Sequence, residues 1–390
     1  MNGKELGRLG GFRLLESLKG GEGSQGRVFR AICEEPCVPG VEPGEIVALK
    51  SMPEYDSDGK SFLKLQKRME SLLKLQHPNI IRYRGCFSAE DAFSSSNVVV
   101  MDLLEGESLA EKLKTRPTGF DVEKALQIVF SALSGLAAAE RAGIIHRDIK
   151  PGNIFICKGD VVKLIDFEIA RNEGASISTA SGLFAGSFDY MAPEFVDPGF
   201  RGDSASDVFS MGVVLHEVLT GVKPYTRVEE KGSQADFAFL SRWNQRQEGK
   251  CAIHVKSVVK KILYHADEVL RQALAEDRDE RYANASEFLS ALKKIRFKEL
   301  LNEGKVYRLL HLVGTGGFGE VFKARVRGQG KLVAVKHMRK SSYGERFRRE
   351  ANVMRRLNDC SFVRFYDYEK TELEKAQKRT WALTDICLAL

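Results

Sequence analysis

The stretch from His146 to Asn153, with the sequence HRDIKPGN, constrains the fold and function of the chain more than any other part. It follows an apolar, helix-like segment and precedes residues 154–156, which have the composition of a strand. A loop held between two rigid elements is where catalytic side chains are usually placed. The spacing also indicates a chemistry. Asp148 can orient a hydroxyl while Asn153, five residues later, holds a divalent metal, and Lys150 can reach a phosphate oxygen.

This stretch resembles the catalytic loop of eukaryotic-type protein kinases, H-R-D-x-K-x-x-N, and its lysine resembles that of the Ser/Thr class. Residues 21–28 fit G-x-G-x-x-G-x-V, a turn whose backbone N–H groups can approach phosphates. Strand-like segments flank this turn on both sides, whereas a dinucleotide-binding turn would lie between a strand and a helix. Residues 46–50 form an apolar strand that ends in Lys50, like the kinase strand whose lysine holds the α and β phosphates.

Further kinase-like motifs follow in the expected order. Residues 164–168, LIDFE, resemble the D-F-G metal motif with Glu168 in place of glycine, and Asp166 keeps the carboxylate that binds Mg²⁺. The resemblance also implies that Asp207 accepts hydrogen bonds from the catalytic loop, and that Arg281 pairs with Glu194. The segment between residues 172 and 186 has the composition of an activation segment, with these candidate phosphate acceptors: Ser176, Ser178, Thr179 and Ser181.

Two residues depart from the family pattern. Kinases carry a glutamate on the helix after the lysine strand, but Arg68 stands at that position, nine residues before His77. Either this helix is rotated or shifted, or its ion pair with Lys50 is absent. Because Arg68 and Glu168 introduce opposite charges into one neighbourhood, we hypothesise that they pair. The alternative is that both side chains are exposed, where such charges contribute little.

The N-terminal motifs recur near the end of the chain. Residues 314–321 form a second glycine-rich turn, and residues 333–336 form a second lysine strand. Glu350 keeps the helix acid in this copy, and no second catalytic loop follows. We therefore expect a kinase domain at 12–296, a linker or helix end at 297–304, and a partial second kinase-like N-lobe at 305–390. The helix beginning near residue 286 is expected to run to Glu303.

Composition and charge are compatible with these interpretations. The chain has 390 residues with 43% hydrophobic and 29% charged residues, which is ordinary for a globular protein of two or three domains. A net charge of +7 is mild and argues against nucleic acid as the main partner. The seven scattered cysteines suit a reducing cytosol, and no signal peptide or membrane span is expected, so we predict a cytoplasmic protein.

The combined prediction is an α+β, two-lobed protein kinase fold, with an antiparallel-sheet N-lobe, a mostly helical C-lobe and an extra kinase-like N-lobe. The implied function is a Ser/Thr kinase that transfers the γ-phosphate of ATP to a protein hydroxyl with Mg²⁺. The alternative is a pseudokinase that acts as a nucleotide-binding or scaffold module. The implied catalytic residues are Asp148, Lys150, Asn153 and Lys50, and the implied metal ligands are Asn153 and Asp166. The implied nucleotide-binding residues are Gly21, Gly23, Gly26, Val28, Lys50, Met101, Asp102 and Leu104. The expected partners are a protein substrate and, for residues 305–390, either the first domain or a second chain.

Overall fold

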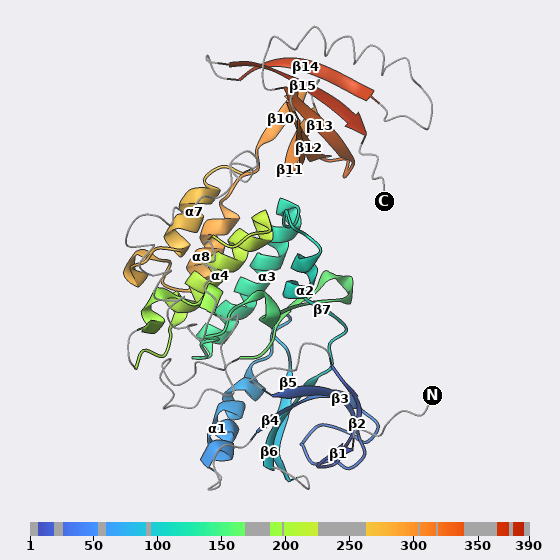
Figure 1. Cartoon of the computed structure of the whole chain (residues 1–390), viewed down its shortest axis with the longest axis vertical. Coiled ribbons are helices and arrows are strands. Elements are labelled where there is room, and N and C mark those ends of the chain that lie inside the picture. Colours follow the sequence, from blue (N-terminus) through green and yellow to red (C-terminus); the bar gives the residue numbers. More distant parts are fainter. Residues whose placement is uncertain are drawn as a thin grey trace, which may run out of the picture.

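The computed structural model describes residues 7–18, 26–53, 60–90, 95–167, 188–196, 199–224, 263–302, 305–316, 319–338, 365–373 and 377–385. Within these residues three parts follow one another along the long axis: a first antiparallel sheet, a helical domain and a second antiparallel sheet (Figure 1). Several residues singled out in the sequence lie outside the described part of the chain: Gly21, Gly23, Glu168, Ser176, Ser178, Thr179, Ser181 and Glu350.

The first sheet has six strands in the order β1-β2-β3-β4-β6-β5, with neighbours antiparallel. Side chains alternate across it, as the period of a strand requires. Val47 and Leu49 are buried on one face of β4, and Lys50 lies on the other face. The strands are β1 Arg8–Leu9, β2 Phe12–Ser17, β3 Arg27–Cys33, β4 Ile46–Pro53, β5 Tyr83–Glu90 and β6 Ser95–Asp102.

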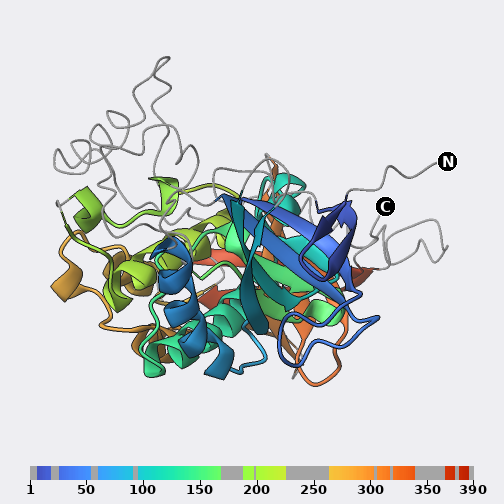
Figure 2. The same cartoon turned by 90° about the horizontal axis from the view of Figure 1, so that it is seen from below.

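One helix, α1 (Lys60–Lys74), lies beside the first sheet (Figure 2). Its apolar residues Leu65, Met69 and Leu72 recur every three or four positions and are almost completely buried. That spacing places them on one face of the helix, and this face packs into the core shared by the sheet and the helical domain.

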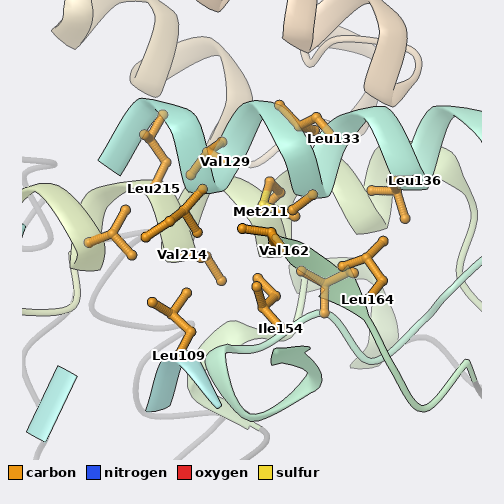
Figure 3. Packing of buried hydrophobic residues seen from close by; sticks show 14 of the residues in the cluster. Leu109, Val129, Leu133, Leu136, Ile154, Val162, Leu164, Met211, Val214 and Leu215 are labelled. Carbon is orange, nitrogen blue, oxygen red and sulfur yellow. The ribbon is translucent and has the colours of Figure 1, made fainter. Parts of the chain in front are cut away.

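The helical domain is built around α3 (Val122–Arg141) and α4 (Ser204–Thr220), whose buried side chains meet in one core (Figure 3). Leu133 and Leu136 of α3 are fully buried against this core. The other helices are α2 Leu109–Lys114, α7 Ala266–Ala273 and α8 Ala285–Lys293. A small sheet of β7 Gly106–Ser108, β8 Ile154–Cys157 and β9 Val162–Leu164 lies against α3 and carries the site. Short 3-10 turns cover Pro151–Asn153, Lys158–Asp160, Phe188–Tyr190, Pro193–Val196 and Arg278–Glu280.

Among the described residues, α3 is the one helix whose length and composition would allow it to cross a membrane. In the structure 61% of its most apolar window is buried inside the protein. It packs on α4, α8 and β9. Burial by its own neighbours explains the apolar composition of this helix, which is that of a core helix.

The second sheet has six antiparallel strands in the order β10-β11-β12-β13-β15-β14. Its strands are β10 Glu299–Asn302, β11 Lys305–Gly316, β12 Gly319–Val326, β13 Leu332–Met338, β14 Phe365–Leu373 and β15 Gln377–Asp385. The predicted helix from about 286 to Glu303 is wrong beyond Lys293, where α8 ends. Residues 299–302, expected to be a linker or helix end, form β10 because they pair with residues 305–308 of β11. This hairpin pairing outweighs the local helical pattern.

Candidate active site

The predicted catalytic loop folds around the carboxylate of Asp148. Lys150 Nζ donates to Asp148 Oδ2 over 2.7 Å, and Asn153 Nδ2 donates to the same oxygen over 2.8 Å. Asn153 Nδ2 also donates to the main-chain oxygen of Asp148 over 2.7 Å. Asp148 and Lys150 are each about one-fifth exposed, so both can meet a substrate, whereas Asn153 is buried. The three residues predicted from spacing therefore meet at one point.

A buried carboxylate binds the backbone of the catalytic loop. Asp207, at the start of α4, accepts the N–H groups of His146 and Arg147, each over 2.8 Å. The Arg147 backbone has φ of 64°, a left-handed conformation that is uncommon for a residue with a side chain. Burial raises the pKa of Asp207 to about 7, and the two N–H donors act in the opposite direction. The predicted role of Asp207 as an acceptor for the catalytic loop is confirmed.

Asp166 follows β9 and lies next to the catalytic loop, because the Ile165 N–H donates to the Asn153 carbonyl oxygen over 3.0 Å. Its Oδ1 is 2.9 Å from Nζ of Lys50, which is almost completely buried on β4. The structure thus brings together Lys50, Asp148, Asn153 and Asp166. Carboxylate and amide oxygens suit Mg²⁺, and the Asn153 amide nitrogen already binds Asp148, so its oxygen is the end left for a metal. The side chains of Asn153 and Asp166 therefore fit a magnesium site.

Tyr83 on β5 is a residue that the sequence analysis missed. Its hydroxyl is buried and accepts the main-chain N–H of Phe167 over 3.3 Å. Burial, together with the nearby Asp166 carboxylate, raises the pKa of Tyr83, so the hydroxyl stays protonated. The Phe167 ring lies 4.5 Å from the ring of His146, whose Nε2 is 3.0 Å from the Ile165 carbonyl oxygen. These contacts hold the Asp166 turn between β5 and the catalytic loop. A tyrosine near the start of a strand is too common for the sequence to have revealed this role.

The buried imidazole of His146 supports the loop without facing a substrate. Burial lowers its pKa, which keeps the ring neutral at ordinary pH. In the neutral ring one nitrogen donates and the other accepts. The Ile165 carbonyl oxygen requires a donor at Nε2, which leaves Nδ1 to accept the Asp148 N–H over 3.3 Å. His146 therefore ties the Asp148 backbone to the turn that carries Asp166.

Of the residues predicted to surround a nucleotide, those that the structure describes lie on β3, β4 and β6 of the first sheet or directly beside these strands. Gly26 has φ of 116°, and a Cβ at this position would lie 2.2 Å from the Ser51 carbonyl oxygen, so the close approach of the two strands requires glycine. Val28 pairs directly with Lys50 across β3 and β4. The predicted nucleotide-binding residues Met101, Asp102 and Leu104 lie in the hinge, the stretch that runs from the end of β6 to the start of β7.

Arg84 occupies the carboxylate of Asp102, with a 2.6 Å bond from Nε to Oδ1. A nucleotide contact at this hinge position would therefore come from the main chain.

Arg68 stands where kinases carry the helix glutamate, and Lys50 has a different partner in this structure. Glu70 is the only acid in the sequence of α1, and its side chain is exposed, because two helical residues after Arg68 turn it about 200° away. Lys50 pairs with Asp166 instead of with a carboxylate of α1. Of the two explanations considered, the structure favours the absence of the usual ion pair. The hypothesised partner of Arg68, Glu168, lies outside the described residues, so that pair stays a prediction.

Comparison with known protein families shows to which family the chain belongs. The family model for the protein kinase domain matches residues 15–292 and again residues 307–387. The chain belongs to the protein kinase family. Its kinase relatives include bacterial Ser/Thr kinases: it is 36% identical over 208 residues to PknL of Mycobacterium tuberculosis, covering 53% of this chain and 49% of that protein. It is also 29% identical over 297 residues to a probable Ser/Thr kinase of Clostridium perfringens, covering 76% of this chain and 39% of that protein.

The protein kinase fold is supported independently by solved structures. The kinase domain of Mycobacterium tuberculosis PknI aligns with a TM-score of 0.52 at 20% identity, covering 75% of this chain and 99% of that domain. At this identity the likeness concerns the fold alone. The chain spans less than half the length of the curated kinases named above.

Proposed function

We propose that residues 12–296 form a Ser/Thr protein kinase that transfers the γ-phosphate of ATP to a protein hydroxyl and requires Mg²⁺. One observation carries the proposal: Lys50, the loop that holds Asp148 and Asn153, and Asp166 come from three separate parts of the sequence and meet at one partly exposed site. The names of the bacterial relatives support the Ser/Thr class. The retained side chains are those on which phosphoryl transfer depends most.

Each side chain has a distinct task in this proposal. Asp148 orients the substrate hydroxyl and accepts its proton, and Lys150, 2.7 Å from it, stabilises charge on the transferred phosphoryl group. Lys50 holds the phosphates of ATP. Asn153 and Asp166 would hold Mg²⁺, which supplies positive charge between the phosphates. Catalysis consists of positioning and charge stabilisation, without a covalent enzyme intermediate.

The Lys50–Asp166 bond replaces the ion pair that other kinases make with a helix glutamate. The Lys50 side chain is only 7% exposed, so its ammonium needs an anionic partner in this environment. ATP phosphates would provide such a partner once nucleotide binds. We propose that the Asp166 turn, held by Tyr83, takes over the orienting role that α1 cannot fulfil.

We further propose that residues 305–390 are a partial second kinase-like N-lobe without transferase activity. The second match of the family model supports this assignment. So does the strand order β10-β11-β12-β13-β15-β14, which repeats the order β1-β2-β3-β4-β6-β5. The register repeats as well: Val321 pairs with Lys336 as Val28 pairs with Lys50. Residues 305–390 contain no H-R-D motif.

Three further proposals rest on the sequence. The substrate is a protein with an accessible serine or threonine. The domain limits are those given above, and a cytoplasmic location follows from the scattered, odd number of cysteines.

The test is a transfer assay with γ-labelled ATP, Mg²⁺ and a generic basic Ser/Thr substrate. Wild-type protein should label the substrate, and Asp166→Asn or excess EDTA should abolish labelling. A matched control is Asp279→Asn, a change at an exposed carboxylate of the 3-10 turn Arg278–Glu280, which should leave the rate unchanged. ATP binding without any transfer by the wild-type chain would instead support the pseudokinase alternative.

A further inference from the structure

Two acidic residues at the start of α3 make ion pairs with the second sheet. Lys323 Nζ on β12 lies 2.5 Å from Oδ2 of Asp121. Arg325, two residues further along β12, contacts Glu123 Oε2 through Nη2 at 2.8 Å and through Nε at 3.0 Å. Arg308 on β11 is 3.9 Å from the other oxygen of Glu123. Three basic side chains of the second sheet thus face two acids of the helical domain that lie far from them in the sequence.

The Asp121 side chain pairs with the second sheet and does not cap its own helix. It is the N-cap residue of α3, where an aspartate usually accepts an N–H from the first turn and contributes about 1 kcal/mol. Here its side chain makes no capping bond, and Oδ2 takes the Lys323 ammonium instead. Its Oδ1 is buried and has no hydrogen-bond partner among the described residues. The carboxylate is therefore oriented for the second sheet and not for its own helix.

The pairing register identifies which face of the second sheet makes the contact. Along β12, Phe322, Ala324 and Val326 are buried, so Lys323 and Arg325 project from the opposite face. Residues directly paired across antiparallel strands share a face. Val321 pairs with Lys336, and Lys323 pairs with Ala334. The face that contacts α3 is therefore the face on which position 336, the lysine of the second lysine strand, lies.

The first sheet shows what that face does in a kinase domain. There Val28 pairs with Lys50 and Arg30 pairs with Ala48 in the same register. Lys50 points from that face to Asp166. The face of the second sheet that contacts α3 thus corresponds to the nucleotide-facing side of the first sheet.

We propose that the second sheet is an intramolecular docking module that binds the N-terminal end of α3 through its nucleotide-equivalent face. This rests on the proposed second N-lobe. While the module is docked, Lys323 and Arg325 on this face are paired with Asp121 and Glu123, so the chain is expected to bind one nucleotide and not two. The module lies on the side of the helical domain opposite to the first sheet (Figure 1). One connection from the module to the catalytic loop is α3, whose 20 residues span about 30 Å and end just before that loop.

The first test uses the full chain and reverses the basic side of the contact. In the variant Lys323→Glu/Arg325→Glu, amide hydrogen exchange across the first turns of α3 should become about tenfold faster, because the helix end opens when its partner leaves. Combining it with Asp121→Lys/Glu123→Lys should restore most of the protection. The matched control is Arg327→Glu, an exposed β-turn residue that pairs with Glu299 within the second sheet. It should leave exchange in α3 unchanged.

A second measurement covers the case in which the reversed variant folds poorly. Calorimetric titration of the wild-type chain with a non-hydrolysable ATP analogue and Mg²⁺ should give one site per chain. Two sites, or unchanged exchange in a folded Lys323→Glu/Arg325→Glu variant, would overturn the docking proposal. Loss of phosphoryl transfer with docking intact would instead count against the proposed kinase activity, so the two failures can be told apart.

Discussion

The ion pair between Arg281 and Glu194 should contribute more to stability than any exposed pair in the helical domain. The Arg281 side chain is 0% exposed and the Glu194 side chain is 11% exposed. The two groups form a bidentate pair, with both N–O distances at 2.8 Å. The three other guanidinium donors reach the carbonyl oxygens of Ala275, Glu276 and Ala205 at 2.7, 2.9 and 3.3 Å. All five N–H groups of this arginine are therefore used.

Replacing Arg281 with methionine keeps much of the side-chain volume and removes every one of these donors. Glu194 would retain only the Ser206 hydroxyl, at 2.8 Å, among its contacts with the described residues. Removing one partner of a buried ion pair typically costs about 3–5 kcal/mol, because the other charge stays buried without compensation. For a domain of this size that loss corresponds to a decrease in Tm of about 5–8 °C.

Urea and thermal unfolding, followed by circular dichroism, measure this loss directly. Arg278→Met is the matched control, because Arg278 is three residues away and pairs with Asp203 while both side chains are more than 40% exposed. An exposed pair of this kind contributes at most about 1 kcal/mol. The reasoning is refuted if Arg281→Met destabilises the protein no more than Arg278→Met does.

Two further predictions concern the site. Tyr83→Phe removes only the hydroxyl that accepts the Phe167 N–H. In steady-state kinetics it should lower kcat and raise the Mg²⁺ concentration for half-maximal rate by about fivefold, the equivalent of one lost hydrogen bond. An unchanged Mg²⁺ dependence would contradict the positioning role of Tyr83. Asp207 has a pKa raised to about 7 by burial, so its contribution to stability is present at low pH and is lost as the pH rises from about 4 to about 7. The stability difference between wild type and Asp207→Asn should therefore shift against the wild type by about 2–3 kcal/mol between pH 5 and pH 8, as measured by urea unfolding. A pH-independent difference would show that Asp207 does not titrate in this range.

The local part of the site could be predicted from the sequence. Asp148, Lys150 and Asn153 lie within six residues, and a short loop between a helix and a strand leaves them few arrangements. Their convergence is confirmed by bonds of 2.7–2.8 Å. The pairs of Asp207 with the catalytic loop and of Arg281 with Glu194 were also predicted, because the family resemblance supplies long-range partners that periodicity cannot.

Other features depended on contacts that the sequence pattern did not indicate. Residues 299–302 have a helical pattern, but their hairpin pairing with β11 makes them a strand. The role of Tyr83 arises from its position beside the Asp166 turn. The contact of Asp121 with Lys323 joins residues 202 positions apart. Charged residues at such spacing more often face solvent, so no pattern in the sequence indicated that these two would pair.

The most direct test of the kinase mechanism is Asp148→Asn, measured for both transfer and binding. The change removes the group that accepts the substrate proton but leaves Lys50 and Asp166 in place. We expect labelled-phosphate transfer to fall by about 10³-fold or more, while the affinity for an ATP analogue with Mg²⁺ changes less than about threefold. A variant that transfers phosphate at the wild-type rate would contradict the assignment of Asp148 and, with it, the proposed mechanism.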